Sequence, residues 1–308
     1  MSRIDAELLV LGSGLAGSMA ALSAASMGRS VILIGSEGSA SQLAQGGIAY
    51  RGSKDPEQFI ADIIKAGCEC NYLPTVELIV RKGPKYIEAW LLDKLNISFD
   101  RLDDGTLDLA LEAAHNTPRI LHIKDSTGAT IMDRVDEAIR KQKNIQRCSG
   151  VLVDLMMSHL HDKRREKSYE TGRATGAYIF DRESEEVVTI TARAVILATG
   201  GFSKLFEHST APGCSRGDGI SAAHRAGART LDLEYVQFHP TALYIPSKPR
   251  SLLTEALRGA GAKLLNADKK HFVDELASRD VVAREIHEEL LRSRSPNVWL
   301  DLDRKSVV

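Results

Sequence analysis

The feature that most constrains the fold is a glycine-rich turn near the N-terminus, Gly12-Ser13-Gly14-Leu15-Ala16-Gly17. The turn follows an apolar stretch at 7–12, which is typical of a strand buried in a parallel sheet. It precedes an alanine-rich stretch at 18–27, which is typical of a helix packed closely on such a sheet. A second apolar strand at 30–34 completes a β-α-β unit of about 30 residues.

The glycine spacing suits a dinucleotide. It lets the backbone approach a pyrophosphate at a helix N-terminus, where amide groups and the helix dipole favour negative charge. Glu37 lies twenty residues after Gly17, where an acidic side chain takes a ribose hydroxyl, and Ser36 is an alternative ribose contact. The competing interpretation is a glycine-rich turn that holds no ligand.

The rest of the chain predicts an α/β fold in two parts. The predicted elements are helices within 56–98 and at 125–141, an antiparallel meander of strands at 151–157, 174–181 and 187–191, a third buried strand at 194–201, and a helix at 218–226. Polar motifs set in loops begin near residue 231. We therefore expect one domain over residues 1–230 and a smaller one over 231–308.

Charge and apolar patterning exclude several classes of function. The 308 residues carry 40 Lys and Arg against 41 Asp and Glu, a balance that gives no electrostatic attraction to nucleic acid or to an anionic membrane. Glycines interrupt the apolar N-terminal stretch, and no apolar run reaches the length of a spanning helix. We expect a cytoplasmic protein with no membrane partner and no metal site.

Three polar motifs interrupt the apolar texture of the last third of the chain. They are His239 within 237–244, the run Thr254-Glu255-x-x-Arg258, and Arg279. Donors of this kind bind a dicarboxylate, and a coupled acid and base move a proton. Taken singly, the same residues are a loop cap, a helical i,i+3 ion pair and a surface cation. Their order behind a nucleotide-binding turn favours a site.

Other segments resemble the flavin contacts of the succinate dehydrogenase/fumarate reductase flavoprotein superfamily. These segments are the loop at 40–49, the strand end at 198–201 and the turn at 215–219. The resemblance implies an FAD-binding Rossmann-like domain of the two-dinucleotide-binding-domain type, with an antiparallel meander and a smaller α+β capping domain. The cofactor contacts that it implies, with those of the glycine turn, are Gly12, Ser13, Gly14, Leu15, Ala16, Gly17, Ser36, Glu37, Ala40, Ser41, Gln42, Leu43, Ala44, Gln45, Gly46, Gly47, Thr199, Gly200 and Asp218. Superfamily members that attach FAD covalently carry a His at the position of Ala40, so the FAD is expected to be non-covalent.

The polar motifs resemble those of the L-aspartate oxidase family, and the similarity runs through essentially the whole chain. It implies that His239 and Thr254 bind substrate carboxylate oxygens. It implies that Arg279 is the proton donor and acceptor, with Glu255 and Arg258 relaying the proton toward solvent. Glu112 takes the position of the family's contact to the substrate amine, where a carboxylate favours aspartate over succinate. Ala113 and Ala114 depart from the family's usual glycines beside it.

This resemblance implies FAD-dependent oxidation of L-aspartate to iminoaspartate, with hydride passing from C2 to flavin N5, in NAD (pyridine nucleotide) and quinolinate biosynthesis. Oxygen or fumarate would accept the electrons, and quinolinate synthase would receive the product. The family's later flavin and substrate segments have no counterpart before residue 308, so a C-terminally truncated oxidase with impaired turnover is expected. The alternatives are a succinate dehydrogenase or fumarate reductase flavoprotein, and a non-catalytic relic of the FAD fold.

Overall fold

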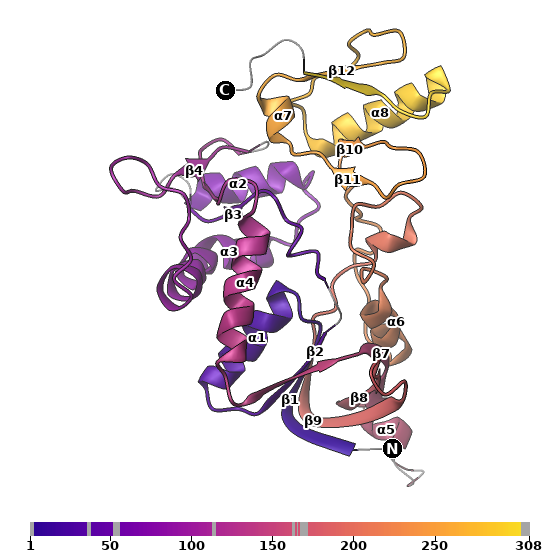
Figure 1. Ribbon diagram of the computed structural model, residues 1–308. Coiled ribbons are helices and arrows are strands. Elements are labelled where there is room, and N and C mark those ends of the chain that lie inside the picture. The colour runs from indigo at the N-terminus through magenta and orange to yellow at the C-terminus, as the bar shows by residue number, and fades with distance from the viewer. Residues whose placement is uncertain are drawn as a thin grey trace. The chain divides into compact units, whose positions relative to one another are not determined.

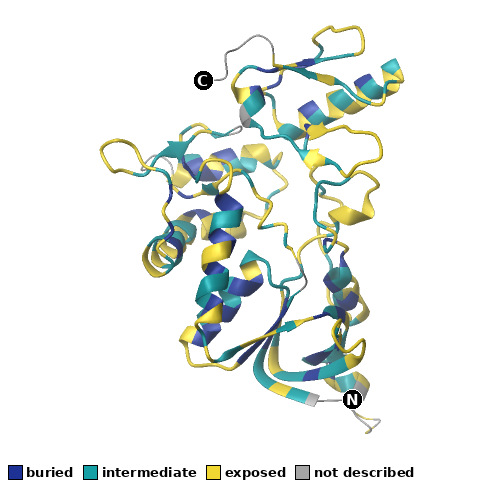
Figure 2. Cartoon of the chain, viewed as in Figure 1, coloured by how far each residue is buried: buried dark blue, intermediate teal, exposed yellow. Residues whose placement is uncertain are grey.

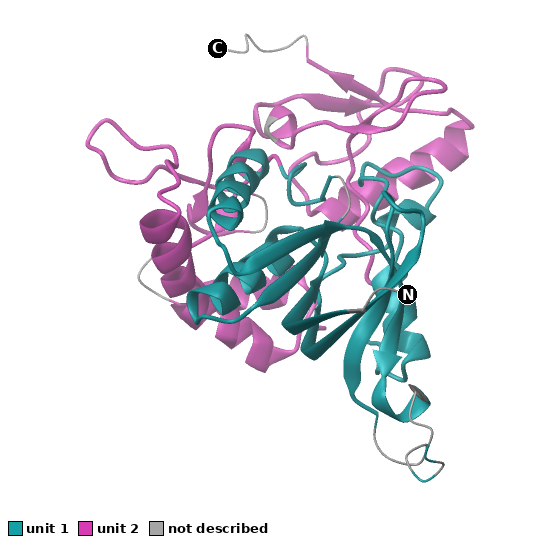
Figure 3. Ribbon diagram, turned by 60° about the horizontal axis from the view of Figure 1, so that its bottom comes forward, with its two compact units in different colours: residues 1–44, 128–234 teal, residues 45–127, 235–308 magenta. Residues whose placement is uncertain are grey.

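The structure is a computed structural model, which describes residues 3–35, 38–51, 56–112, 115–161, 164, 166 and 172–302. The chain divides by its internal contacts into two compact units, coloured separately in Figure 3. Unit 1 contains residues 1–44 and 128–234, and unit 2 contains residues 45–127 and 235–308. Each unit therefore joins segments that are far apart in the sequence.

Unit 1 is built on a six-stranded mixed sheet with the strand order β6-β2-β1-β9-β8-β7 (Figure 1). The strands are β1 (Arg3–Leu11), β2 (Val31–Gly35), β6 (Ile145–Ser149), β7 (Val151–Met157), β8 (Ala174–Phe180) and β9 (Val187–Leu197). β2 and β9 run parallel to β1, and β6 runs parallel to β2. β8 pairs antiparallel with both β7 and β9. The predicted parallel strands at 7–12 and 30–34 and the predicted meander are confirmed, and they belong to one sheet.

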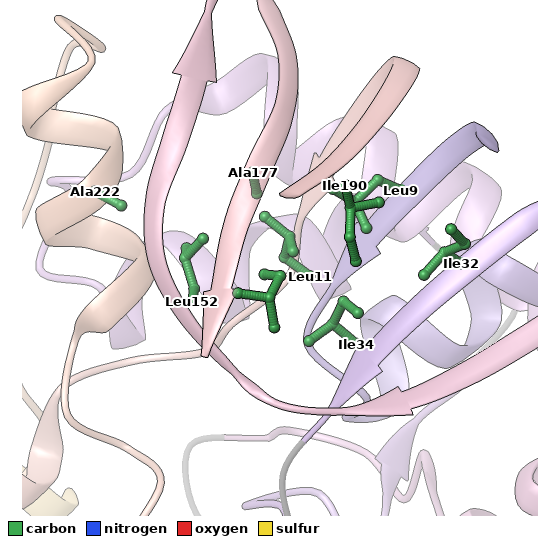
Figure 4. Close-up of a cluster of buried hydrophobic side chains, with 9 residues drawn as sticks. Leu9, Leu11, Ile32, Ile34, Leu152, Ala177, Ile190 and Ala222 are labelled. Atoms are coloured by element: carbon green, nitrogen blue, oxygen red, sulfur yellow. The ribbon is translucent and has the colours of Figure 1, made fainter. Parts of the chain in front are cut away.

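The core of unit 1 follows from the alternation of side chains along these strands. Leu9 and Leu11 of β1 share a buried cluster with Ile32 and Ile34 of β2, shown in Figure 4. Val10 lies between the two leucines and is also fully buried, so β1 is covered on both faces. Helix α1 (Leu15–Ser26) contacts β1, β2 and β6, and its buried alanines let it pack closely.

The prediction of a third buried strand at 194–201 is wrong in two respects. These residues complete β9, one continuous strand whose first half pairs with β1 and β8 and whose second half pairs with β1. Ile196 and Leu197 are 36% and 39% exposed. Apolar residues alone indicated burial on both faces. Burial requires a layer against each face, and among the described residues this end of β9 is covered only in part: Val195 packs on the core, whereas Ile196 and Leu197 stay partly exposed.

Unit 1 has further helices, of which the two longer ones fall where helical spacing predicts them and the two short ones were not predicted. They are α4 (Thr127–Arg140, whose first residue belongs to unit 2), α5 (Ser158–His161), the short 3-10 helix η3 (Ser203–Leu205) and α6 (Asp218–Arg225). The expected apolar face of α4 is buried: Ile131, Val135 and Ile139 are at most 2% exposed. In Figure 2 this helix carries dark-blue buried stretches between exposed ones.

Unit 2 combines helices with three small antiparallel sheets, β3-β5-β4, β10-β11 and β12-β13. Its helices are α2 (Pro56–Ala66), α3 (Leu73–Tyr86), the π-helical η1 (Ile87–Lys94), α7 (Ala256–Gly259) and α8 (Arg279–Ser293). Its strands are β3 (Ile48–Ala49), β4 (Leu109–Ala110), β5 (Ile120–Leu121), β10 (Ala242–Leu243), β11 (Ser251–Leu252), β12 (Lys263–Leu265) and β13 (Trp299–Asp301). One small core joins α2 to α3, and another joins α8 to β12 through Leu264, Val273 and Val282. No helix among the described residues has the length and apolar character needed to cross a bilayer.

Candidate active site

A cavity of about 280 Å³ lies in unit 1, where the parallel strands end. Leu11, Gly35, Gly150 and Ala198 line it, and each stands at or just after the carboxyl end of β1, β2, β6 or β9. Ligands of parallel α/β sheets bind outside the carboxyl ends of the strands. The N-terminus of α1 also borders the cavity and favours negative charge there.

The glycines of the turn have different physical roles. Gly12 has φ +111°, and a Cβ there would lie 2.2 Å from the carbonyl oxygen of Ala198. A Cβ on Gly17 would lie 1.9 Å from the carbonyl oxygen of Gly12, so both positions must be glycine for the turn to close. At Gly14 the nearest atom would be Ser41 Oγ at 3.5 Å, an ordinary contact. Gly14 therefore leaves free a space on the cavity wall, as close approach of a pyrophosphate requires.

Most of the predicted cofactor residues of unit 1 meet at this cavity. Those that line it are Gly12, Ser13, Gly14, Leu15, Ala16, Ala40, Ser41, Thr199, Gly200 and Asp218. Ser41 fixes the loop at 38–44 to α1, because its hydroxyl accepts the Leu15 N–H at 3.1 Å. Ser36 and Glu37, the predicted ribose contacts, lie outside the described residues.

The other predicted cofactor residues lie elsewhere. Gly17 packs against Gly12 behind the turn. Gln42, Leu43 and Ala44 form a turn, and the Ala44 carbonyl accepts the Gly128 N–H at 2.9 Å. Gln45, Gly46 and Gly47 belong to unit 2, where a Cβ on Gly47 would meet the Leu121 carbonyl at 2.2 Å. Gln45 Oε1 is buried without a hydrogen-bond partner in the described chain, which leaves an acceptor for a ligand N–H.

Several lining residues were not predicted as cofactor contacts, among them Gly150, Val151, Arg182 and Cys214. Gly150 and Val151 follow β6, whose sequence Ile-Gln-Arg-Cys-Ser lacks an apolar run and gave no strand signal. A hydrogen bond from Cys214 Sγ to the Gly38 carbonyl, at 3.6 Å, joins two walls of the cavity. Recognising β6 as the third parallel strand would have identified its carboxyl end as part of the site.

In unit 2, Arg279, Glu255 and Arg258 form a continuous chain of charge-assisted hydrogen bonds. Arg279 donates to Glu255 Oε2 from Nε at 3.0 Å and from a terminal nitrogen at 2.6 Å. Arg258 donates to Glu255 Oε1 at 2.6 Å and to the backbone carbonyl of Glu275 at 2.6 Å. One carboxylate thus bridges two guanidinium groups, and the structure brings these three predicted residues together.

The environments of the two arginines differ. The Arg258 side chain is 1% exposed, whereas Arg279 is 35% exposed at the first position of α8. The helix dipole disfavours a cation at that end, and Glu255 offsets this. Burial raises the pKa of Glu255, but hydrogen bonds and charge from Arg279 and Arg258 outweigh burial and hold that pKa below its ordinary value. Glu255 is therefore ionised at neutral pH.

His239 is electrostatically coupled to the same chain of charges. Burial lowers the pKa of His239, and the charges of Arg279 and Arg258 act in the same direction. Its Nδ1 lies 3.0 Å from the carbonyl oxygen and 3.2 Å from the amide nitrogen of Thr241. The backbone thus holds the ring by Nδ1, and Nε2 is the nitrogen that remains for a ligand. Thr254 precedes Glu255 directly and is half-buried.

Glu112 shares the electrostatic field of this cluster. Burial raises the pKa of Glu112; the Arg279 charge acts against this, and the Glu255 charge adds to it. The carboxylate also lies against Gly46, where a Cβ would come within 3.0 Å of Oε1. Unit 2 thus offers an anionic group in Glu112, a cationic group in Arg279 and an uncharged imidazole in His239, a combination that suits an amino dicarboxylate.

Two residues of this cluster were not predicted. Gln237 Oε1 accepts a hydrogen bond from Arg279 at 3.2 Å, and Glu275 holds Arg258 through its carbonyl. Gln237 stands at the start of the motif at 237–244, so its polar side chain was a usable signal. The Glu275 contact is made by the backbone, which any residue type supplies, so its side-chain identity carried no signal.

The chain is similar to known proteins along nearly its whole length. The family model described as FAD binding domain matches residues 7–306. A curated L-aspartate oxidase of Vibrio cholerae is 37% identical over 97% of this chain and 57% of its own length. One of Clostridium acetobutylicum is 33% identical over 97% of this chain and 67% of its own length. The chain spans about half to two thirds of the length of the curated relatives that it matches.

The fold has close counterparts among solved structures. The FrdA chain of E. coli quinol fumarate reductase superposes with a TM-score of 0.84 at 23% identity, over 99% of this chain and 55% of that one. This likeness shows the fold, a mixed α/β fold with small antiparallel sheets. The chain belongs to the FAD binding domain family and, within it, to the L-aspartate oxidases.

Proposed function

We propose that the chain carries the FAD site and part of the substrate site of an enzyme that oxidises L-aspartate to iminoaspartate in NAD biosynthesis. The observation that carries this proposal is the hydrogen-bonded chain Arg279–Glu255–Arg258, electrostatically coupled to His239 and Glu112. It joins groups that bind carboxylates, a group that attracts an ammonium and a route for a proton.

Oxidation of the amine to an imine removes a hydride from C2 and a proton from nitrogen, and the side chains of unit 2 manage the proton. Arg279 is the more exposed of the two arginines; as it takes the substrate proton it would pass one of its own N–H protons to Glu255, so its guanidinium keeps one charge. Glu255 is 23% exposed, so solvent reaches its carboxylate. Arg258 is enclosed and keeps a positive charge beside Glu255; passage of the proton outward through Arg258 stays a prediction.

The remaining residues would choose the substrate. His239 Nε2 and Thr254 would donate to carboxylate oxygens. Glu112 would accept from the ammonium group, and it would repel an additional negative charge. Succinate lacks the ammonium and would leave the half-buried Glu112 carboxylate unpaired, which disfavours its binding. This selects an amino dicarboxylate over an unsubstituted one.

FAD, when bound, supplies the two-electron acceptor. Gly14, Ser41, Thr199 and Asp218 on the cavity wall would hold it, and Ala40 supports non-covalent binding. Oxygen or fumarate would reoxidise it, and quinolinate synthase would take the product in the cytoplasm; these assignments rest on the family alone.

The test is the flavin absorbance of the purified protein under anaerobic conditions. We expect a yellow protein whose absorbance near 450 nm bleaches with L-aspartate and not with succinate. Bleaching by succinate in preference to aspartate would instead indicate a dehydrogenase of the fumarate reductase type. A folded protein that binds no FAD would indicate a non-catalytic relic and contradict the proposal.

Arg279→Lys tests the proton route directly. Lysine keeps the charge but lacks the planar fork that contacts Glu255 from two nitrogens, so flavin reduction by aspartate should slow by about 10²–10⁴-fold. Arg284→Lys is the matched control, because Arg284 lies on the same helix and is 66% exposed. Equal rates in the two variants would exclude Arg279 from the proton step.

A further inference from the structure

A buried carboxylate on α2 organises the segment that follows Glu112. Asp62 is 3% exposed. Its Oδ2 accepts from Arg119 at 2.7 Å and from the Asn116 backbone N–H at 3.2 Å. Its Oδ1 accepts from Gln58 at 3.0 Å and from the Asn116 side chain. Four donors thus converge on one carboxylate, and three of them belong to Asn116 and Arg119, which lie more than 50 positions away.

Arg119 is fully buried and completes the same network. It donates to Thr117 Oγ1 at 2.8 Å, and a terminal nitrogen lies 3.2 Å from His115 Nδ1. Its guanidinium also stacks over the Phe59 ring of α2, at 4.2 Å from the centroid. Arg119 therefore holds the two ends of the segment at 115–119 and fastens them to α2.

Stability alone does not explain this pair. Removing two charges from water costs several kcal/mol, and apolar residues of similar size are often as stable in their place. Arg119 also leaves its buried Nε without a hydrogen-bond partner in the described chain. What the pair supplies, which apolar packing does not, is one defined conformation of the backbone that it holds.

That backbone carries Glu112. The Arg119 N–H donates to the Ala110 carbonyl at 3.1 Å, in the pairing of β4 with β5. The His115 N–H donates to the Glu112 carbonyl at 3.2 Å. Glu112 is thus bonded through its backbone to a residue that the network fixes, and none of the groups proposed to bind carboxylates belongs to the network.

We propose that the Asp62–Arg119 pair is a positioning element that fixes Glu112 and thereby sets the preference for an amino dicarboxylate over an unsubstituted one. This inference rests on the proposed function, in which Glu112 contacts the substrate ammonium. Loss of the pair should weaken aspartate binding and leave succinate binding nearly unchanged, because the carboxylate contacts stay in place.

The test compares aspartate and succinate binding, by ligand-induced thermal shift and calorimetric titration, in the wild type and two variants. Arg119→Lys keeps a positive charge beside Asp62, but a single ammonium group cannot contact Asp62, Thr117 and His115 at the same time. The double variant D62N/R119M leaves no unpaired buried charge, so it should fold with near wild-type stability. In both variants we expect the ratio of aspartate to succinate affinity to fall about tenfold or more.

Two controls separate positioning from stability. Val80→Ala weakens the packing of α2 on α3 at a residue that is 5% exposed, so it should lower the melting temperature and keep the ratio. Glu57→Gln removes an exposed ion pair from the same helix, and it too should keep the ratio. Amide hydrogen exchange of residues 115–121 should rise in the pair variants alone.

The outcomes distinguish this inference from the proposed function. A wild type that prefers aspartate, with pair variants that retain the full preference, would overturn the positioning role and leave the function intact. A wild type with no preference would overturn both. A preference lost equally in Val80→Ala would show that general stability sets it, and would also overturn the positioning role.

Discussion

At the scale of single residues, the titration of Glu112 is expected to be visible in substrate binding. Burial raises the pKa of Glu112, and only its ionised form attracts an ammonium. Aspartate affinity should therefore be constant at neutral pH and fall as the pH drops through this raised pKa, before ordinary glutamates protonate. Calorimetric titration across pH measures this, and Glu112→Gln should bind aspartate weakly without that step. An unchanged step in the variant would assign it to another group.

Gly14 allows cofactor binding to be separated from folding. A methyl group there meets protein atoms only at ordinary distances but occupies the cavity wall. We expect Gly14→Ala to keep the wild-type melting temperature of the apoprotein and to lose at least about tenfold in FAD affinity. Gly17→Ala is the contrasting variant, because its Cβ would collide with the Gly12 backbone and destabilise the turn itself. Flavin fluorescence and thermal melting measure the two effects, and unaltered FAD affinity in Gly14→Ala would refute this cofactor position.

At this scale the sequence predicted side chains better than it predicted contacts. Arg279, Glu255 and Arg258 were found by their type and order, and the structure brings them together. The Asp62–Arg119 network was not found, because its partners are separated by 57 positions and lie on no common motif. Pairing of distant residues depends on how helices and loops pack, and a single sequence carries no local trace of it.

At the scale of elements, α8 and β12 share a small core that supports the proton relay. Leu264 is 1% exposed within this core, and α8 begins at Arg279. Leu264→Ala should lower the free energy of unfolding by about 2–5 kcal/mol. Leu276→Ala is the control, since that side chain is 67% exposed and its loss should change stability by less than about 0.5 kcal/mol. Chemical denaturation compares them, and equal effects would contradict a packed core here.

Strands were predictable where an apolar run coincided with burial. β1 and β2 were found because both of their faces are covered. β6 was missed because Gln146 and Arg147 face solvent on a strand whose pairing comes from the backbone. β9 was divided in two because Arg193 interrupts its apolar pattern, although the pairing with β1 continues past it. Hydrogen bonding across a sheet is independent of side-chain type, so its extent is only partly encoded in apolar patterns.

At the scale of the whole molecule, two buried carboxylates, Asp62 and Glu275, and the half-buried Glu255 should govern acid stability. Burial raises the pKa values of Asp62, Glu255 and Glu275, but hydrogen bonds from neighbouring donors outweigh it, so all three pKa values lie below the ordinary ones. The folded state then binds fewer protons than the unfolded state, and stability falls as the pH drops below about 4. Urea midpoints between pH 7 and pH 3 measure this. The double variant D62N/R119M should show a shallower decline, and an identical slope would contradict a contribution from Asp62.

The sequence did not predict which segments of the chain form each compact unit. Residues 45–127 join residues 235–308 in unit 2, although more than two thirds of unit 1, residues 128–234, lies between them in the sequence. The change of texture near residue 231 indicates one crossing between the units. The chain also passes between the units after residue 44, inside the flavin-like loop at 40–49, and after residue 127, at the start of α4. The composition does not change at either point. The expected domains at 1–230 and 231–308 therefore stay a prediction from texture.

The half-buried Cys214 places a thiol that reagents can label on the wall of the cavity. Its thiol stands on the wall between Gly38 and the turn before α6, where a bound dinucleotide would shield it. Alkylation by a maleimide should therefore slow in proportion to occupancy, while the exposed Cys68 and Cys70 react alike with and without FAD. Peptide mass spectrometry resolves the sites, and equal labelling of Cys214 in both states would contradict shielding. The labelling rate of this one native thiol therefore measures the fraction of protein that holds FAD, and the measurement needs neither enzyme turnover nor flavin absorbance.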